Sequence, residues 1–182
     1  MKKKYKVIPK ILFITGLSSS GKTTLALFLK KKLNNLSINK VVYIDGDKFR
    51  KQFNFHKYDN TSRKEIGDKK IKFANKYLNL NKLVIVTGIG HKKVWRKKIK
   101  KKYKNLIEIY TKCPLKICEQ RDHKKNYFRA KNKIIKNFIG INEKYQEGNT
   151  VDLILNAYKD NVSKNTNKIV KYLKLKKYVY KK

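Results

Sequence analysis

The eight residues Gly16–Thr23 have the types and spacing of a phosphate-binding loop. They read Gly-Leu-Ser-Ser-Ser-Gly-Lys-Thr, which fits the pattern G-x-x-x-x-G-K-[ST], and they directly follow the apolar run Ile11–Thr15. Between a strand and a helix, the backbone N–H groups of such a loop and the N-terminus of the helix converge on phosphate oxygens. The residues expected to bind ATP are Gly16, Leu17, Ser18, Ser19, Ser20, Gly21, Lys22, Thr23 and Thr24.

Lys22, Thr23 and two aspartates could supply the chemistry of phosphoryl transfer. Within the loop, the position of Lys22 assigns it to the β- and γ-phosphates, and the position of Thr23 assigns it to Mg²⁺. The apolar run Val41–Ile44 ends in Asp45-Gly46-Asp47, at the edge of the sheet where open α/β folds bind ligands. One carboxylate can accept the proton of an attacking hydroxyl while the other orients water around the metal. Lys22 and Asp47 are therefore the candidate catalytic residues, with Mg²⁺ as cofactor and ATP as phosphoryl donor.

Both patterns also have plain structural interpretations. A degenerate loop can be kept for structure alone, and Asp-Gly-Asp by itself is a common turn. The third apolar run, Leu83–Thr87, carries no acidic residue at its end, where a motor or switch GTPase usually places a metal-binding Asp. This favours a small-molecule kinase over a motor.

Strand-like and helix-like segments alternate along the chain. The strand-like runs are Ile11–Thr15, Val41–Ile44, Leu83–Thr87, Leu106–Thr111 and Val151–Leu155. The helix candidates are Lys22–Leu33, Lys48–Phe53, Arg63–Leu80, Lys92–Lys102, Leu115–Arg121, Ala130–Asn137 and Asp160–Leu173. We expect an α/β fold of the P-loop NTPase class, with a mostly parallel five-stranded sheet and helices on both faces. Ser62 followed by Glu65 predicts a capping box at the start of the third helix.

The segment Asp122–Gly140 is polar and basic and has no strand pattern. Such a segment late in a kinase fold is a natural lid over ATP. Its basic residues could neutralise charge on the transferred phosphoryl group. The candidate lid residues are Arg121, Lys124, Arg129 and Lys131, and Arg121 is also expected to bind ATP.

The net charge of +37 comes from 49 Lys and Arg against 12 Asp and Glu in 182 residues. This length predicts a single kinase domain, with a core over about residues 10–174 and the lid over about 122–140. The basic residues are nearly all Lys and are spread along the whole chain, so we expect non-specific attraction of polyanions. A nucleic-acid-binding P-loop protein or a polynucleotide kinase is the alternative that the charge favours.

Several features bear on location and on the remaining polar residues. The basic start and the run Ile11–Ile14 imitate a secretory leader, but the run is short and leads directly into the phosphate loop. No run approaches the length that crosses a bilayer, so we expect a cytoplasmic protein without membrane contact. Cys113 and Cys118 lack a matching ligand cluster and are expected to be reduced packing residues. Two further expectations are that His56, His91 and His123 are exposed and not catalytic, and that the Lys-rich ends, residues 1–10 and 174–182, are frayed or at the surface.

A series of short motifs follows in a specific order. They are the loop Gly16–Thr23, Asp45-Gly46-Asp47 with Arg50, Arg63-Lys64-Glu65, Cys118–Asp122, Lys124 with Tyr127, and Asn137–Ile141 followed by Tyr145. Together they resemble adenylylsulfate kinase, the family that phosphorylates the ribose 3′-hydroxyl of adenylyl sulfate in sulfate assimilation. The resemblance extends from about Ile11 to Leu155.

The resemblance implies roles for individual residues. It makes Asp47 the base or metal organiser, and it places Arg50 and Arg63 against a small-molecule nucleotide acceptor. Tyr58 and Phe138 fall where two aromatic residues sandwich the acceptor base, an interaction worth about 1–3 kcal/mol. The candidate acceptor-binding residues are Asp45, Arg50, Tyr58, Arg63, Lys124, Phe138 and Ile139. A second copy of the chain is a further candidate partner.

The chain departs from the family pattern on the acceptor side. Where the family reads Arg-x-Glu-Asn-Ile-Arg-Arg, Ile66 replaces an amide that would contact the acceptor, and Asp68 replaces an arginine. The loop Gly88–His91 stands in place of the family's Ile-Ser-Pro, and Ile139 replaces a threonine of the lid. Losing a hydrogen-bonding partner can change substrate discrimination by orders of magnitude. A cytidine diphosphate derivative such as cytidine diphosphoramidate, used in surface-polysaccharide modification, therefore stays open as an alternative acceptor.

Overall fold

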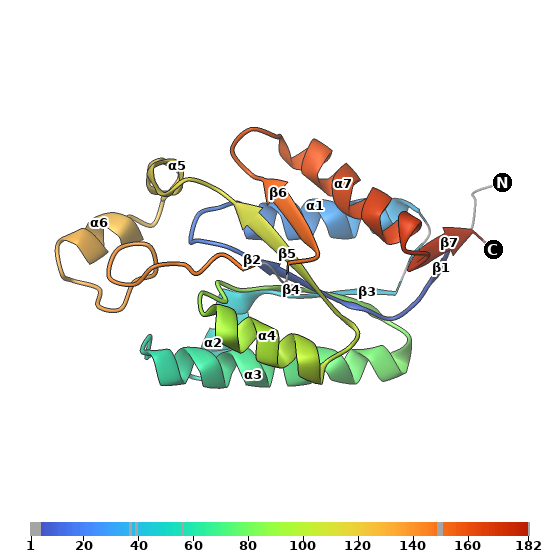
Figure 1. The fold of residues 1–182 in the computed structure, drawn as a ribbon, viewed down its shortest axis with the longest axis horizontal. Helices are drawn as coiled ribbons and strands as arrows, with labels where there is room; N and C mark the ends of the chain where they lie inside the picture. Colours follow the sequence, from blue (N-terminus) through green and yellow to red (C-terminus); the bar gives the residue numbers. More distant parts are fainter. Residues whose placement is uncertain (1–4, 37, 39, 56, 149–150, 182) are drawn as a thin grey trace.

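The computed structural model describes residues 5–36, 38, 40–55, 57–148 and 151–181. Its centre is a sheet of five parallel strands, which confirms the predicted α/β fold class. The strands are β2 (Ile11–Thr15), β3 (Val41–Ile44), β4 (Leu83–Thr87), β5 (Leu106–Lys112) and β6 (Leu153–Asn156). Their order across the sheet is β3-β4-β2-β5-β6, so the strand that precedes the phosphate loop lies in the middle (Figure 1).

Helices cover both faces of this sheet (Figure 1). One face carries α1 (Lys22–Asn35) and α7 (Val162–Leu175), and the other carries α2 (Gly46–Gln52), α3 (Asn60–Lys76) and α4 (Lys93–Lys102). A 3-10 helix, η1 (Tyr77–Leu80), continues α3, and two short helices, α5 (Leu115–Gln120) and α6 (Asn126–Lys131), follow β5.

The central strand β2 is buried along its whole length because its residues alternate between two cores. Leu12 and Ile14 belong to the core shared with α1 and α7. Ile11 and Phe13 belong to the core shared with α2, α3 and α4. A strand covered on both faces needs apolar residues at every position, which accounts for the unbroken apolar run before the phosphate loop.

Helix α3 begins earlier than the sequence predicts. Its N-cap is Asp59, whose Oδ1 accepts a hydrogen bond from Ser62 N at 2.9 Å and whose Oδ2 accepts one from Ser62 Oγ at 2.8 Å. The predicted capping box of Ser62 and Glu65 is therefore wrong, because the Asp59 carboxylate takes the capping position three residues upstream. Arg63 consequently lies inside the helix instead of at its start.

The segment after β5 also differs from the prediction. The expected helix Ala130–Asn137 is wrong: α6 ends at Lys131, and Lys133 and Asn137 have left-handed φ angles of 60° and 57° that a continuing helix excludes. Asp122 Oδ2 accepts a hydrogen bond from Tyr127 N at 2.7 Å at the start of α6. The segment also has a small apolar core of its own, formed by Leu17, Cys113, Cys118, Tyr127 and Ile139.

Residues near the two ends of the chain pair with each other. Strands β1 (Tyr5–Val7) and β7 (Val179–Lys181) form an antiparallel two-stranded sheet, with Val7 opposite Val179. Of the two expected alternatives, fraying is wrong for these residues because they are paired and Val179 is buried against the core of α1 and α7. Lys6 and Tyr180 are exposed at the surface, as the other alternative predicts. Residues 1–4 and 182 lie outside the described residues.

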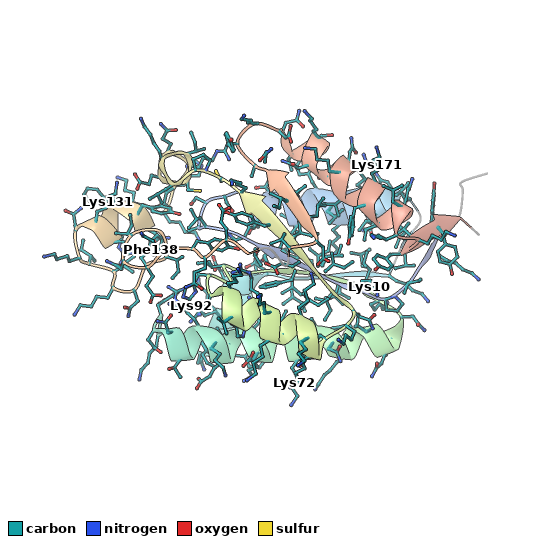
Figure 2. All side chains as sticks on the ribbon, in the orientation of Figure 1. Lys10, Lys72, Lys92, Lys131, Phe138 and Lys171 are labelled. Carbon is teal, nitrogen blue, oxygen red and sulfur yellow. The ribbon has the colours of Figure 1, made fainter. Side chains whose placement is uncertain are left out.

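Lysine side chains project from both helical layers, as Lys72 of α3 and Lys171 of α7 illustrate (Figure 2). Cys113 and Cys118 are buried and free, as predicted. Among the described residues, no helix combines the length and the apolar character that a membrane span requires.

Candidate active site

The phosphate loop connects β2 to α1, and its shape depends on two glycines. Gly16 has a φ of 139°, and a Cβ at this position would lie 2.4 Å from Thr111 Oγ1 of β5. Gly21 is the N-cap of α1 and has a φ of 87°. Only glycine adopts such angles without strain. The hydroxyls of Ser20 and Thr111 share a hydrogen bond of 2.8 Å that fixes the loop to the sheet. The N-terminus of α1 lines a cavity beside the loop, which is the position that an anion site requires.

Lys22 lines this cavity, which has a volume of about 440 Å³ and is called the donor cavity below. Its ammonium donates a hydrogen bond to Leu17 O. Burial lowers the pKa of Lys22 to about 8, and the negative charge of Asp47 acts in the opposite direction. Phosphate oxygens would add further negative charge and favour the ammonium form. The other predicted loop residues that line the donor cavity are Ser18, Ser19, Gly21, Thr23 and Thr24.

The two aspartates after β3 have different environments. Asp45 is the N-cap of α2: its Oδ1 accepts hydrogen bonds from the N–H groups of Asp47 and Lys48, at 3.0 Å each, and its Oδ2 accepts one from the Tyr43 hydroxyl at 2.7 Å. Burial acts to raise the pKa of Asp45, but these hydrogen bonds outweigh it and lower the pKa. The Asp47 side chain, in contrast, is 87% exposed and lies 3.8 Å from Lys124 Nζ. Asp45 therefore fixes the turn, and the Asp47 carboxylate is accessible to a substrate.

A groove of about 730 Å³, called the aromatic groove below, includes Tyr58 and Phe138 in its lining. The guanidinium of Arg50 in α2 lies 4.6 Å from the Tyr58 ring centroid, and that of Arg63 in α3 lies 5.4 Å from it. Arg63 also donates a hydrogen bond of 2.8 Å to Asn137 O, which connects α3 with the segment after α6. Aromatic rings and guanidinium groups together suit a planar, anionic nucleotide.

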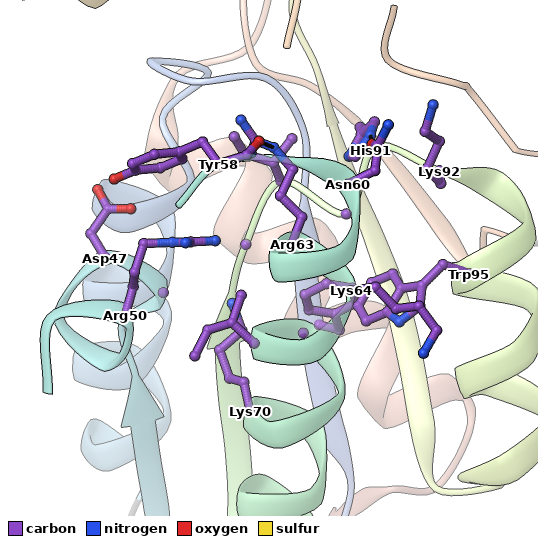
Figure 3. A pocket seen from close by; sticks show the side chains of 17 residues that line it. Asp47, Arg50, Tyr58, Asn60, Arg63, Lys64, Lys70, His91, Lys92 and Trp95 are labelled. Atoms are coloured by element: carbon purple, nitrogen blue, oxygen red, sulfur yellow. Dashed lines mark hydrogen bonds between the residues drawn. The ribbon is translucent and has the colours of Figure 1, made fainter. Parts of the chain in front are cut away.

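A smaller cavity of about 110 Å³, called the cation pocket below, includes residues of α2, α3 and the loop after β4 in its lining. Figure 3 shows Arg50, Arg63 and Lys70 around the same space. The charged residues that line it are Asp47, Arg50, Arg63, Lys64, Lys70 and Lys92. Lys70 was not expected in the site, because one Lys among 49 basic residues is no signal by itself. Its place between Ile66 and Ala74 on the buried stripe of α3 is the signal that could have found it.

Asp47 lines the donor cavity, the aromatic groove and the cation pocket. Ile89, in the loop after β4, shares this property. The three spaces thus meet at one exposed carboxylate.

The candidate lid residues do not all reach these spaces. Lys124 lines both the donor cavity and the aromatic groove, and Arg129 lines the groove. Arg121 lines the donor cavity, and its guanidinium donates a hydrogen bond of 2.8 Å to Ala157 O. Lys131 instead pairs with Glu119 at 2.7 Å on the outside of the segment. Ile139 is fully buried in the small core, so its side chain is not available to an acceptor.

Leu17 also differs from the other loop residues. Its side chain is buried in the same small core, and only its backbone carbonyl is directed to Lys22. Leu17 thus joins the phosphate loop to the lid segment by packing.

The departures from the family pattern divide into two kinds. Asp68 accepts a hydrogen bond from Trp95 Nε1 at 2.8 Å and pairs with Lys64 at 3.2 Å, so it fastens α4 to α3. Ile66 and the loop Gly88–His91, in contrast, line the cation pocket. The second kind therefore alters the lining of a cavity in the candidate site.

His91 is 5% exposed, so the expectation that it is solvent-exposed is wrong. Its Nε2 lies 3.0 Å from Asn60 Oδ1 and 3.2 Å from Glu143 Oε2. Burial lowers the pKa of His91 to about 4, assisted by the charge of Arg63. A neutral His91 thus joins the start of α3 to residues that follow the lid segment. His123 is exposed as predicted, and His56 lies outside the described residues.

Thr23, Asp45 and Asp47 line the donor cavity together and present oxygen atoms, which are the ligands that Mg²⁺ prefers. The described residues contain no group of three or more His, Cys, Asp or Glu side chains that could hold a metal ion by themselves. This donor set fits a Mg²⁺ ion that takes its remaining ligands from nucleotide phosphates and water.

Comparison with known proteins identifies the family of the chain. The family model for adenylylsulphate kinase matches residues 8–156. The chain is 35% identical over 168 residues to the cytidine diphosphoramidate kinase of Campylobacter jejuni subsp. jejuni, with 92% of this chain and 98% of that protein covered. It is 34% identical over 167 residues to the adenylyl-sulfate kinase of Clostridium acetobutylicum, with 90% and 82% covered.

A solved structure of the APS kinase of Mycobacterium tuberculosis, in complex with AMPPNP and APS, resembles this fold with a TM-score of 0.85. The two are 26% identical, and the match covers 92% of this chain and 99% of that one. The resemblance inferred from the sequence motifs is thereby confirmed. The chain is an ATP-dependent P-loop kinase and belongs to the adenylylsulphate kinase family.

Proposed function

We propose that this kinase transfers the γ-phosphate of ATP to a ribose hydroxyl of a nucleotide, with the 3′-hydroxyl of adenylyl sulfate as the leading acceptor. The observation that carries the proposal is the position of Asp47, which lines the donor cavity, the aromatic groove and the cation pocket. A hydroxyl held at Asp47 would lie between a phosphate site and a base site.

On the donor side, the backbone of the phosphate loop and the N-terminus of α1 hold the phosphates of ATP. The Lys22 ammonium would turn from Leu17 O to the β- and γ-phosphates when ATP binds. Thr23, together with ordered water, would hold Mg²⁺, which would supply positive charge to the phosphates of ATP. Arg121 and Lys124 line the same cavity and add positive charge beside the transferred group.

On the acceptor side, Tyr58 and Phe138 would hold the base. Arg63 contacts Tyr58 and Asn137, and through these contacts it would fix the orientation of the base. The Asp47 carboxylate then accepts the proton of the ribose hydroxyl. The hydroxyl oxygen forms a bond to the γ-phosphorus as the bond from that phosphorus to the β,γ-bridging oxygen breaks, and ADP leaves.

Cytidine diphosphoramidate is the second candidate acceptor. Two observations favour it: Ile66 and the Gly88–His91 loop line the cation pocket in place of the family's usual residues, and a relative of this name matches along nearly its whole length. The apolar Ile66 side chain cannot give the hydrogen bond that an amide would give to adenylyl sulfate.

A coupled assay that measures ADP release tests the proposal. Purified protein with Mg²⁺ and ATP is supplied separately with adenylyl sulfate and cytidine diphosphoramidate, beside a control kinase for each acceptor. We expect phosphate transfer to adenylyl sulfate. Transfer to cytidine diphosphoramidate alone would replace the leading acceptor, and transfer to neither, where the controls are active, would contradict the proposed reaction.

A further inference from the structure

Lys70 is a buried cation to which the proposed reaction assigns no role. It is 6% exposed and lines the cation pocket. Its Nζ lies close to the backbone of two turns of the site, since a Cβ on Gly88 would be 2.7 Å from it and a Cβ on Gly46 would be 3.1 Å from it. The ammonium therefore occupies the space between the turn after β3 and the turn after β4.

The ammonium of Lys70 has little compensation within the protein. Among the described residues it donates one hydrogen bond, to Thr87 O at 2.9 Å, and forms no salt bridge. An ammonium has three N–H donors, so two remain for another partner. Burial lowers the pKa of Lys70 to about 8, and the charge of Arg50 lowers it further while Asp47 and Asp45 act to raise it. A buried cation in this state gains most from an added anion.

The charge around Lys70 has the same sign. Arg50, Arg63, Lys64 and Lys92 also line the cation pocket, and among the described residues of its lining Asp47 is the one carboxylate. At about 110 Å³ the pocket is smaller than the usual range for a whole small-molecule ligand, whereas the aromatic groove, at about 730 Å³, lies within that range. The groove can thus take a nucleoside, and the pocket can take one small anionic group attached to it.

We infer that Lys70 is a specificity-determining residue, whose ammonium binds the second anionic group of the acceptor nucleotide, the one beyond its 5′-phosphate. This inference rests on the proposed function, because it takes the acceptor base to lie in the aromatic groove. It defines the acceptor class as nucleotides with two linked anionic groups. Nucleoside monophosphates leave the Lys70 ammonium without its partner and are bound less tightly.

Calorimetric titration of the Lys70→Met variant tests this inference. Met keeps the length and burial of the side chain and removes its charge. The donor cavity is first saturated with Mg²⁺ and the unreactive ATP analogue AMPPNP, and the protein is then titrated with adenylyl sulfate, AMP, CDP and CMP. For the base that binds, we expect the wild-type preference for the nucleotide with two anionic groups over its monophosphate to fall about tenfold or more in the variant, while monophosphate affinity changes little.

Lys72→Met is the matched control, because Lys72 is an exposed lysine of the same helix. It should keep the wild-type preference. A Lys70→Met variant that keeps the full preference, or that loses affinity equally for both nucleotides of a pair, would overturn the inference, since the second result is what a purely structural role of Lys70 predicts.

Proton uptake by the wild-type protein gives a readout that does not depend on the variant folding. At pH 8 the phosphate and sulfate groups of these nucleotides are fully ionised, and AMPPNP already pairs with Lys22. Titration in buffers with different heats of ionisation should show proton uptake with adenylyl sulfate or CDP, and less with the monophosphate. Equal uptake for both would count against Lys70. These binding measurements need no turnover, so they test the role of Lys70 separately from the proposed reaction. The proposed reaction is tested by the transfer assay alone.

Discussion

The donor side and the acceptor side of this site are built in different ways. The donor side comes from one short stretch, in which the loop Gly16–Thr23 connects β2 to α1 and acts largely through backbone geometry. The acceptor side combines side chains of α2, α3, the loop after β4 and the segment after α6. The donor side thus depends on few side chains, whereas the chemistry of the cation pocket changes with single side chains, such as Ile66.

Lys22→Ala should have the largest effect of any single substitution in the site. It removes the cation nearest the β- and γ-phosphates, so we expect phosphate transfer to fall by about 1,000-fold or more. The fold should persist, because the Lys22 ammonium bonds to Leu17 O and not to the sheet. The rate is measured in the coupled assay and the fold by thermal unfolding. Lys31→Ala, an exposed lysine of the same helix, is the control and should leave the rate unchanged.

Asp47→Asn tests the point where the two sides meet. The amide keeps the size of the side chain but cannot accept the proton, so we expect turnover to fall by about 100-fold or more while ATP binding is retained. ATP binding is measured by calorimetry in parallel with the rate. Normal turnover in this variant would show that Asp47 is not the base.

Tyr58→Ala should affect the acceptor side alone. It removes one ring of the aromatic groove, and base stacking is worth about 1–3 kcal/mol, so we expect the KM for the acceptor to rise about tenfold. Tyr58→Phe keeps the ring and should keep the KM. An equal rise in the KM for ATP would show that the two sides are not separate in function.

The effect expected of His91 is on stability at low pH and not on the reaction rate. The pKa of His91 is lowered to about 4 by burial, while the unfolded chain has the ordinary value of about 6.5. Between these values the unfolded state binds more protons, so the free energy of unfolding should fall as pH decreases from about 6.5 to about 4. Denaturant unfolding of wild type and His91→Gln across this range checks it. If the two curves stay parallel, His91 does not contribute to acid sensitivity.

The sheet and the donor side could be predicted from the sequence because their signals are local. Five apolar runs and one loop motif gave the strands and the phosphate-binding turn within a few residues. The predicted capping box was wrong because the Asp59 carboxylate caps the helix in place of Ser62. The prediction of a helix over Ala130–Asn137 was wrong because left-handed angles at Lys133 and Asn137 break it. Asn adopts such angles more often than most residues, but Lys does not, so nothing in the sequence indicated the angle at Lys133.

The acceptor side was only partly predictable because it depends on which side chains point inward. Tyr58, Arg50 and Arg63 were expected, and they do lie together in the aromatic groove. Lys70 was missed because a lysine on a helix is normally exposed. The burial of His91 was missed because it depends on residues that are its neighbours in space and not in the sequence. Only the packing of α3 against β4 and α4 makes these two residues part of the site.

The antiparallel pairing of β1 with β7 has a practical consequence. It brings both described ends of the polypeptide out at one pole of the molecule, while α6 lies at the opposite pole (Figure 1). A surface tether or a fluorescent reporter attached there would stay remote from the donor cavity and the aromatic groove. Single molecules could therefore be immobilised with both substrates free to enter. The same pairing also suits circular permutation, which works best where the two ends of a domain lie together.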